Sequence, residues 1–452
     1  MKASSTAPLR HRPFRFLLAG RTINAIGNSF APIALAFAVL DLTGSATDLG
    51  FVVGARTVVN VAFLLFGGVL ADRLPKNLLM VGSSVAAGLT QGVVAVLVLT
   101  HSATIPLLIG LAAINGMVGA LALPASASIL PQTVPADIRQ QANAIGRIFL
   151  NGAAILGAPA AGIVVAAVGP GWGIAVDAIT FLLSAVCFAG LGLAMSRSKA
   201  EVALTAVPGE RVAEEVASGV PSEDFGLAGA ADAVPEKRPG IVFDLRSGWS
   251  EFRSRTWLWV VVAGFCLANM AWAGALFVLG PVVADDTFGR RAWGFVLAAQ
   301  TAGMIIGGLI ALRLRLRRLL YFGVAACALL AVPVFLLGIY PNFWVLAVSS
   351  LIAGAGLEQF GVAWETTMQE HIPADKLARV YSYDMVGSFV AIPIGEMAIG
   401  PISHAVGAEA ALIGAGVLMT VAFVGQLSSR DVRTLPHKLP EPENELVKES
   451  VA

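Results

Sequence analysis

Ionisable side chains inside long apolar runs are the residues of this 452-residue sequence best placed to do chemistry. The second half of the chain holds four such carboxylates, Glu358, Glu365, Asp384 and Glu396. A charge within hydrocarbon costs about 2.5–3.5 kcal/mol on insertion scales, so each of them needs a reason. Removal from water favours the neutral form of a carboxyl group, which suits reversible proton binding. We therefore predict proton-coupling candidates here, with a buried structural network as the alternative.

Depth along the expected helices separates these carboxylates. At a rise of about 1.5 Å per residue, Glu358 and Glu396 lie far from their helix starts and well inside the bilayer. We expect Glu358 to be the better proton carrier, because Glu396 is closer to the outer face and to water. Glu365 and Asp384 lie near inner helix ends, where structural or gating ion pairs are the simpler interpretation.

Two arginines within apolar runs, Arg56 and Arg147, are candidates to bind an anionic substrate or to serve as counter-ions. Arg21 is close enough to the inner end of the first run to reach the interface by snorkelling. Trp272 and Trp364 are candidates to line a pocket for a planar substrate, although an interfacial Trp belt is the common alternative.

Other chemistries have little support in the residue pattern. The five histidines and three cysteines have no metal-ligand spacing, and no nucleophile–base pair stands out. No GxxxxGK[ST] motif for nucleotide binding is present. The net charge of +1 gives no general attraction for nucleic acid. We predict no enzyme activity, no cofactor, no metal and no nucleic-acid partner.

Membrane helices must position the candidate residues. The chain is 57% hydrophobic and 13% charged, with a mean hydropathy of +0.79. About 20 mostly apolar residues span a bilayer. Twelve runs fit, in two sets of six: 16–40, 48–70, 78–99, 105–128, 144–168 and 172–195, then 257–284, 293–312, 319–339, 343–366, 380–403 and 408–427.

The two sets define the predicted domains, with an amino-terminal bundle over 1–195 and a carboxy-terminal bundle over 257–428. Residues 196–256 are rich in charge, Pro and Gly, which predicts a cytoplasmic linker that ends in a short interfacial helix. Residues 429–452 form a cytoplasmic tail. With both termini inside, 25 of the 30 Lys and Arg face the cytoplasm, which predicts this orientation in the cell membrane.

Short motifs recur at matching positions of the two halves. Gly50-Phe-Val and Gly294-Phe-Val open the second and eighth runs, and Gly157 corresponds to Gly395. Six-plus-six repeats are typical of transporters in which two bundles rock about a midplane site. Receptors and membrane enzymes have no physical need for such repeats.

A turn motif joins the second and third runs, in Gly68-Val-Leu-Ala-Asp72-Arg73-Leu-Pro-Lys76. It resembles the major facilitator superfamily signature G-x-L-a-D-r-x-G-r-k, with Pro75 in place of the usual Gly. The resemblance implies that Asp72 latches the two bundles in the outward-facing state. The alternative is a solvated turn in which Arg73 and Lys76 are simply cytoplasmic charges.

The fifth run carries a second motif, Gly152-Ala-Ala-Ile-Leu-Gly157-Ala-Pro159-Ala-Ala-Gly162, which resembles the Gly/Pro motif of exporters in this superfamily. Small residues allow a helix to approach the opposite bundle, and Pro159 permits a bend. Ordinary small-residue packing is the alternative. The fourth run has Asn115-Gly116 but lacks the Arg of the exporter motif R-x-x-Q-G, so the proton role of that Arg does not carry over.

The segment from Phe360 to Pro373 and the later run from Arg379 to Ser388 are similar to an actinobacterial branch of the superfamily that includes enterobactin and macrolide exporters. The expected fold is an all-α membrane protein with twelve helices in two six-helix bundles. The expected function is export of an amphiphilic drug, siderophore or secondary metabolite by alternating access with proton antiport. An importer or lipid flippase on the same fold is the alternative, and a non-transporting receptor or scaffold has less support. The expected partners are the substrate, protons and the lipid bilayer, and the expected state is a monomer.

Overall fold

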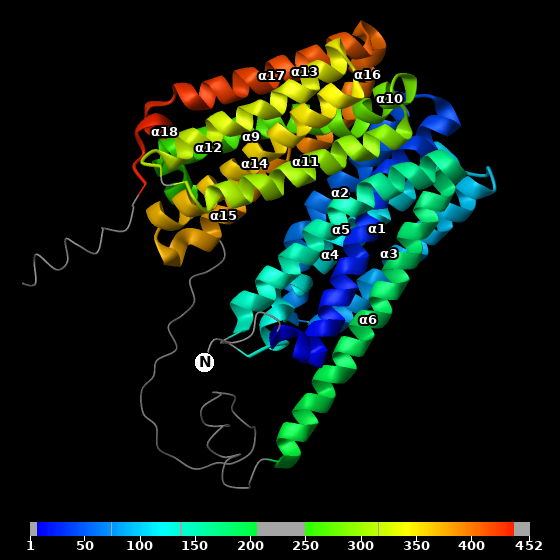
Figure 1. Cartoon of the computed structure of the whole chain (residues 1–452), viewed down its shortest axis with the longest axis vertical. Helices are drawn as coiled ribbons and strands as arrows, with labels where there is room; N and C mark the ends of the chain where they lie inside the picture. Colours follow the sequence, from blue (N-terminus) through cyan, green and yellow to red (C-terminus); the bar gives the residue numbers. More distant parts are fainter. Residues whose placement is uncertain (1–6, 74, 136–137, 206–248, 315, 438–452) are drawn as a thin grey trace, which may run out of the picture.

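The computed structural model describes residues 7–73, 75–135, 138–205, 249–314 and 316–437. This part of the chain is helical, without a strand, and holds twelve stretches long and apolar enough to cross a membrane. The predicted all-α membrane protein with twelve membrane helices in two bundles is confirmed (Figure 1).

Six long helices form the amino-terminal bundle. After the short 3-10 helix η1 (Ala7–Arg10) they are α1 (Arg12–Thr43), α2 (Ala46–Arg73), α3 (Lys76–Leu99), α4 (Ile105–Ile129), α5 (Arg139–Val168) and α6 (Pro170–Thr205), with η2 (Leu130–Gln132) following α4. Gly44 ends α1 in the left-handed region, at φ 64°, which glycine adopts without steric cost. The helix α6 continues through Thr205, beyond the predicted bundle boundary at residue 195.

The carboxy-terminal bundle contains interrupted helices. Its elements are α9 (Thr256–Ala273), the π-helical η4 (Gly274–Leu279), α10 (Gly280–Asp286), α11 (Arg290–Ala311), α12 (Leu319–Cys327), η5 (Ala328–Leu330), α13 (Ala331–Ile339), α14 (Phe343–His371), α15 (Ala374–Phe389), α16 (Ile392–Val406), α17 (Ala408–Ser428) and α18 (Arg430–Thr434). The predicted eleventh run is divided between α15 and α16, just before Pro393. Proline has no backbone N–H, so Pro393 cannot donate the hydrogen bond that a continuous helix would require.

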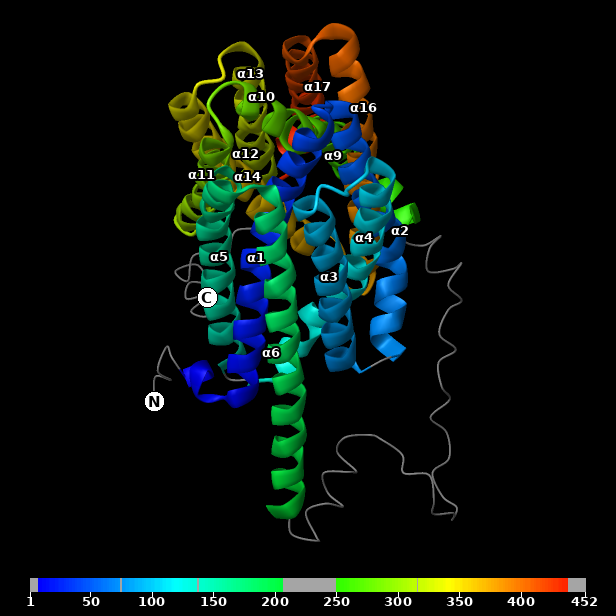
Figure 2. The same cartoon turned by 90° about the vertical axis from the view of Figure 1, so that its right-hand side faces the viewer.

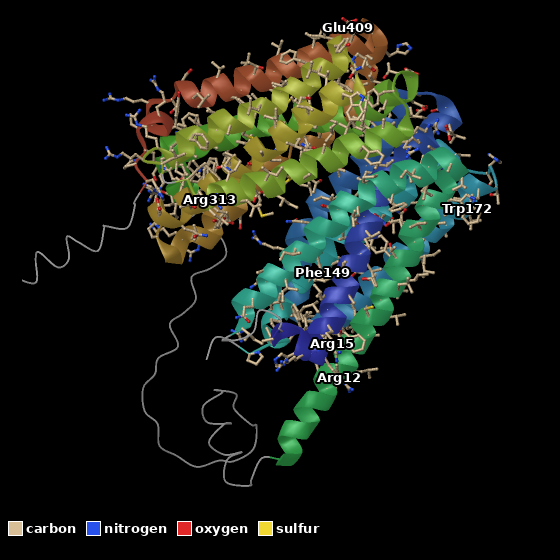
Figure 3. All side chains as sticks on the ribbon, in the orientation of Figure 1. Arg12, Arg15, Phe149, Trp172, Arg313 and Glu409 are labelled. Atoms are coloured by element: carbon tan, nitrogen blue, oxygen red, sulfur yellow. The ribbon has the colours of Figure 1, made fainter. Side chains whose placement is uncertain are left out.

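The two bundles touch at one end and diverge toward the other (Figure 1), and Figure 2 looks onto the touching end. Between them, α11 packs on α5 and α16 packs on α2. We call the touching end, at the α1–α2 and α10–α11 turns, the closed side, and the opposite end the open side. Arg12, Arg15 and Arg313 lie at the open side, whereas Trp172 and Glu409 lie at the closed side (Figure 3).

The predicted interfacial helix is described only in part, because 206–248 lie outside the described residues. Residues 249–254 are helical. The Trp249 and Phe252 rings stack at 5.6 Å and both contact Tyr383 of α15. Arg255 pairs with Glu251 at 2.6 Å. The segment therefore packs on the open-side end of the carboxy-terminal bundle.

Candidate functional site

Glycines bring the backbones of facing helices together at the closed side. Gly50 of α2 lies against the carbonyl oxygen of Glu396 in α16, and Gly294 of α11 lies against that of Ala158 in α5. A Cβ at either glycine would collide with the facing backbone, so no other residue allows this approach.

The two contacts are equivalent under the internal repeat. Gly50 corresponds to Gly294, and the residues that follow the paired Gly157 and Gly395 are Ala158 and Glu396. The repeat therefore places the same close contact on both flanks of the interface. The side chains at the paired positions differ, because Glu396 in the second half carries a carboxylate where Ala158 in the first half has a methyl group.

The exporter-like motif of α5 faces both bundles. A Cβ at Gly162 would lie 3.0 Å from the carbonyl oxygens of Arg290 and Arg291, so Gly162 makes the expected approach to the opposite bundle. Gly157 instead packs on Ser29 of its own bundle, where a Cβ would lie 2.7 Å from the Ser29 Cβ. The helix passes through Pro159 without interruption.

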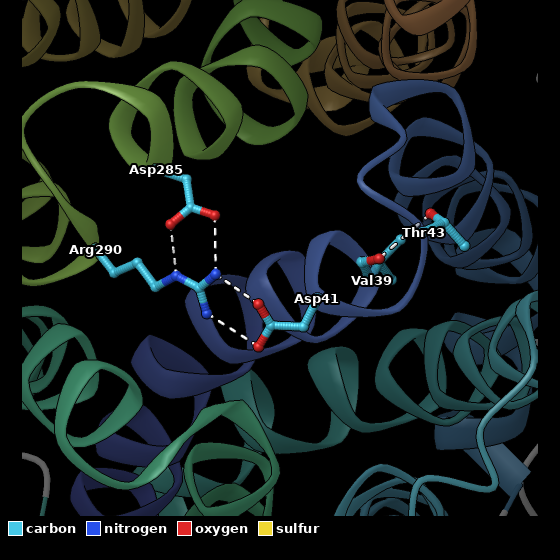
Figure 4. Close-up of polar contacts among 5 residues, drawn as sticks. All are labelled: Val39, Asp41, Thr43, Asp285 and Arg290. Atoms are coloured by element: carbon cyan, nitrogen blue, oxygen red, sulfur yellow. Dashed lines mark hydrogen bonds and ion pairs between the residues drawn. The ribbon is translucent and has the colours of Figure 1, made fainter.

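Arg290 connects three helices at the closed side. Its guanidinium lies between Asp41 of α1 and Asp285 of α10, with nitrogen–oxygen distances of 2.5 to 3.0 Å (Figure 4). The same group lies 4.8 Å from the centre of the Phe37 ring. These charges were not among the predicted site residues.

A polar pocket of about 370 Å³ lies within the amino-terminal bundle, which is in the range of small-molecule sites. Its polar lining consists of two arginines, four asparagines and three serines: Arg21, Asn24, Asn28, Arg56, Asn60, Ser83, Ser84, Asn115 and Ser126. Apolar residues, including Phe181 and Phe188, complete the wall. The lining extends through Met80 and Ser126 toward the open-side ends of α3 and α4. The mixture suits a ligand with a polar and an apolar part.

Hydrogen bonds fix some of the pocket amides and leave one donor available. Asn60 Nδ2 donates to the Gly116 carbonyl at 3.0 Å, which joins α2 to α4. Asn28 Nδ2 donates to Asn24 Oδ1 along α1. Asn115 is only 6% exposed, and its Nδ2 has no hydrogen-bond partner among the described residues.

Two buried carboxylates flank Arg56 and interact with it electrostatically. Asp177 of α6 is fully buried and accepts a hydrogen bond from Gln91 Nε2 at 2.6 Å. Glu396 reaches across the bundle interface and accepts a hydrogen bond from Thr57 of α2. Each carboxylate has one oxygen without a partner in the described structure. Glu396 is 2% exposed, which corrects the expectation that it lies close to water.

The predicted carboxylates Glu365 and Asp384, at helix ends on the open side, belong to a local network. Trp364 Nε1 donates to Asp384 Oδ2 at 2.9 Å, and Ser388 Oγ donates to Oδ1 at 3.2 Å. The Tyr381 hydroxyl donates to Glu365 Oε2 at 2.9 Å. Trp364 therefore packs within the carboxy-terminal bundle and does not line the polar pocket.

The structure places the remaining candidates apart from the pocket. Glu358 is partly buried beside Gly308 of α11. Trp272 lines a separate space of about 20 Å³ with Trp293. Arg147 is exposed on α5.

The turn motif with Gly68, Asp72, Arg73 and Lys76 spans the end of α2 and the start of α3. The side chains of Gly68, Asp72 and Arg73 lie outside the described part of the structure. The latch role of Asp72 stays a prediction.

A spacing signal for the pocket was present in the sequence. Arg21, Asn24 and Asn28 are separated by three and four positions, and Arg56 and Asn60 by four, so each set lies on one helix face. Arg21 lines the pocket, which corrects its assignment as a snorkelling residue.

Comparison with known proteins identifies relatives of the whole architecture. The model of the Major Facilitator Superfamily matches residues 17–396. No curated protein matches the chain significantly in sequence. A bacterial homologue of the human lysosomal transporter Spinster, inward-facing and unoccupied, is similar in structure with a TM-score of 0.67 and 13% identity, over 93% of this chain and 96% of that one.

Two further solved structures have the same fold. A bacterial homologue of the iron transporter ferroportin, inward-facing, has a TM-score of 0.64 and 16% identity, over 92% of this chain and 99% of that one. The nucleoside transporter NupG has a TM-score of 0.62 and 14% identity, over 92% and 100%. At these identities the likeness concerns the fold alone.

Proposed function

Because this chain belongs to the major facilitator superfamily, we propose that it exports an amphiphilic small molecule in exchange for protons by alternating access. The family and the similar structures are membrane transporters, so the chain is a multi-pass membrane transporter and not an enzyme. The proposal concerns the direction of transport, the substrate and the coupling ion.

One observation carries the proposal: the bundles meet at one side only, and the polar pocket extends toward the other. This arrangement corresponds to one end state of a rocking carrier. With the termini in the cytoplasm, the open side admits a substrate from the cytoplasm, as an exporter requires. The mixed lining of the pocket supports an amphiphilic substrate.

Glu396 is the proposed proton carrier. Its repeat equivalent is Ala158, so the packing of the interface does not itself need a carboxylate. Returning an ionised carboxylate to this buried interface would cost several kcal/mol of desolvation, whereas the protonated form avoids that cost. A proton taken up on the far side would therefore favour the return of the carrier to the state described here.

The test is a panel of amphiphilic compounds on everted vesicles whose lumen has been acidified. An exporter that exchanges substrate for protons should raise the lumenal pH when its substrate is added, as followed by recovery of a quenched pH-sensitive dye. Vesicles without the protein are the background control. Substrate-dependent proton movement with the opposite sign would contradict antiport and support the importer alternative.

A further inference from the structure

We infer that the transported molecule carries an anionic group, such as a carboxylate, sulfonate or phosphate, which Arg21 and Arg56 bind in the pocket of the amino-terminal bundle. The inference rests on the proposed function only in taking this pocket as the substrate site. It specifies the charge of the substrate, which the fold and the family leave open.

The charge of the pocket wall is the first argument. Two guanidinium groups, from α1 and α2, line the pocket, and its other described lining residues are all uncharged. Asp177 and Glu396 interact with Arg56 but do not line the pocket. A cation entering this space would meet two like charges in a medium of low dielectric, whereas an anion would be attracted.

The available hydrogen-bond donors are the second argument. Among the described residues, no carboxylate lies within ion-pair distance of Arg21 or Arg56. Guanidinium groups present paired N–H donors that match the oxygens of carboxylates and phosphates. The buried and unpartnered Nδ2 of Asn115 adds a neutral donor from α4. A buried donor left without an acceptor costs free energy, so a ligand oxygen that accepts this hydrogen bond would stabilise the bound state.

Arg56 links the anion to proton exchange. In the described state Glu396 is held at α2 by Thr57 and is attracted by Arg56, which stabilises contact at the closed side. An anion bound to Arg56 weakens that attraction and leaves the ionised Glu396 uncompensated, which favours opening of the closed side. The substrate thus favours opening of the closed side, and a proton taken up by Glu396 then favours its closure, as exchange requires.

Equilibrium binding to the purified full-length protein tests the inference, with matched probes in place of the unknown substrate. The probes are naphthalene, biphenyl and octyl compounds, each bearing a carboxylate, a carboxamide or an ammonium group. At least one carboxylate should bind about tenfold or more tightly than its amide, and its ammonium analogue should bind more weakly still. Arg21→Gln and Arg56→Gln should each lower carboxylate affinity by about 10- to 100-fold and change amide affinity little.

Two further variants guard against misfolding and general charge effects. Arg56→Lys keeps the charge and should retain a preference for the carboxylate. Arg313→Gln removes an exposed charge at the open side of the other bundle and should bind all probes as the wild type does. Equal affinity for amide or ammonium probes, unchanged carboxylate affinity in both Gln variants, or failure of all three carboxylates to bind would overturn the inference.

The binding and transport experiments can contradict the two proposals independently. Carboxylates that bind but elicit no proton movement in vesicles would sink the export proposal and leave anion recognition standing. Proton-coupled export of cationic or neutral compounds that the carboxylates do not inhibit would sink anion recognition and leave export standing.

Discussion

Asp41 of α1 and Arg290 of α11 bind each other across the bundle interface, where Arg290 Nη1 and Nη2 donate to the two Asp41 oxygens at 3.0 and 2.5 Å. The Asp41 side chain is 41% exposed and that of Arg290 is 22% exposed. Exposed ion pairs stabilise by about 0.2–1 kcal/mol, and a bidentate geometry favours the upper part of that range. The pair is therefore a modest lock on the closed side.

Asp41→Asn should shift the population toward carriers open at the closed side by about twofold to fivefold. The distance between spin labels at Ser45 and Thr287, in a cysteine-free background, measures this shift. Asp285→Asn is the matched control, because Asp285 contacts the same guanidinium from within the carboxy-terminal bundle. Raising the salt to about 1 M should bring the wild type toward Asp41→Asn. An equal shift in both variants would contradict a lock between bundles.

This lock was beyond the reach of sequence patterns. The partner of Arg290 lies 249 positions away in the other half of the chain. Helical spacing rules relate residues within one helix, and no local pattern marks Asp41 as facing α11.

Gly294→Ala should prevent full closure of the closed side. The added Cβ would meet the backbone carbonyl of Ala158, and overpacking of this kind costs about 1–3 kcal/mol. We expect slower transport and a longer distance between the same two labels. Gly110→Ala is the control, since nothing lies within 4 Å of the Cβ that it would introduce. Unaltered distances in Gly294→Ala would show that the interface tolerates a side chain there.

Hydropathy predicted the membrane helices well because each must contain a run of about 20 mostly apolar residues, which is visible in the sequence. It could not predict the π-helical turn Gly274–Leu279 or the division between α15 and α16 before Pro393. The π-helical turn lies at a close packing contact, where the Cβ of a residue at Gly274 would lie 2.7 Å from the Gly395 carbonyl. The division reflects the missing N–H of Pro393, a backbone effect that hydropathy does not measure.

The site was predicted less completely than the fold. The search for charges within the spans found Arg56, but asparagines are uncharged and passed unnoticed although four of them line the pocket. Arg21 was assigned to the interface because depth along a helix does not say which face a side chain occupies. Spacing within α1 carried that information, and only the packing of α1 on its neighbours shows that the face encloses a pocket.

The orientation of the protein rests on the distribution of basic residues and is directly testable. A membrane-impermeant maleimide applied to intact cells should label a cysteine placed at Thr287, in the closed-side turn. It should not label one placed at Ser222, which lies outside the described residues. Labelling of both after permeabilisation is the control for reactivity. Labelling at Ser222 in intact cells would reverse the assigned orientation.

Acid should weaken the attachment of the 249–254 segment. Hydrogen bonds from Lys376 at 2.9 Å and Arg255 at 2.6 Å hold the pKa of Glu251 below its ordinary value. Because the folded-state pKa is lowered, the stabilisation is complete above the ordinary pKa of about 4.3 and is lost as pH falls through the lowered value. Glu251→Gln should therefore lower the melting temperature at pH 7, and the difference from wild type should begin to shrink below about pH 4.3 and vanish only once the pH lies below the lowered pKa. The exposed Asp286→Asn is the control, and a gap that persists in acid would contradict the role of this ionised carboxylate.

Glu396 provides the sharpest test of proton coupling. The glutamate is 2% exposed, bonded to Thr57 of the opposite bundle, and equivalent by the repeat to Ala158. Depth along the helix favoured Glu358, yet the structure places Glu358 beside Gly308 within its own bundle. Contact across the interface is what a group must have if its protonation is to change the state of the carrier.

Glu396→Gln mimics the protonated acid, so it should bind substrate as tightly as the wild type or more tightly, because Arg56 has lost a competing charge. The variant should also lose its coupling to the proton gradient. Substrate-induced proton movement in everted vesicles should fall by at least tenfold, while substrate-for-substrate exchange continues. Glu358→Gln is the matched variant and should keep its response to pH between about 6 and 8. If Glu358→Gln alone loses coupling, the proton site lies within the carboxy-terminal bundle. If both variants keep full pH-dependent export, neither residue carries the proton, and coupling must be sought at Asp384 or Glu365.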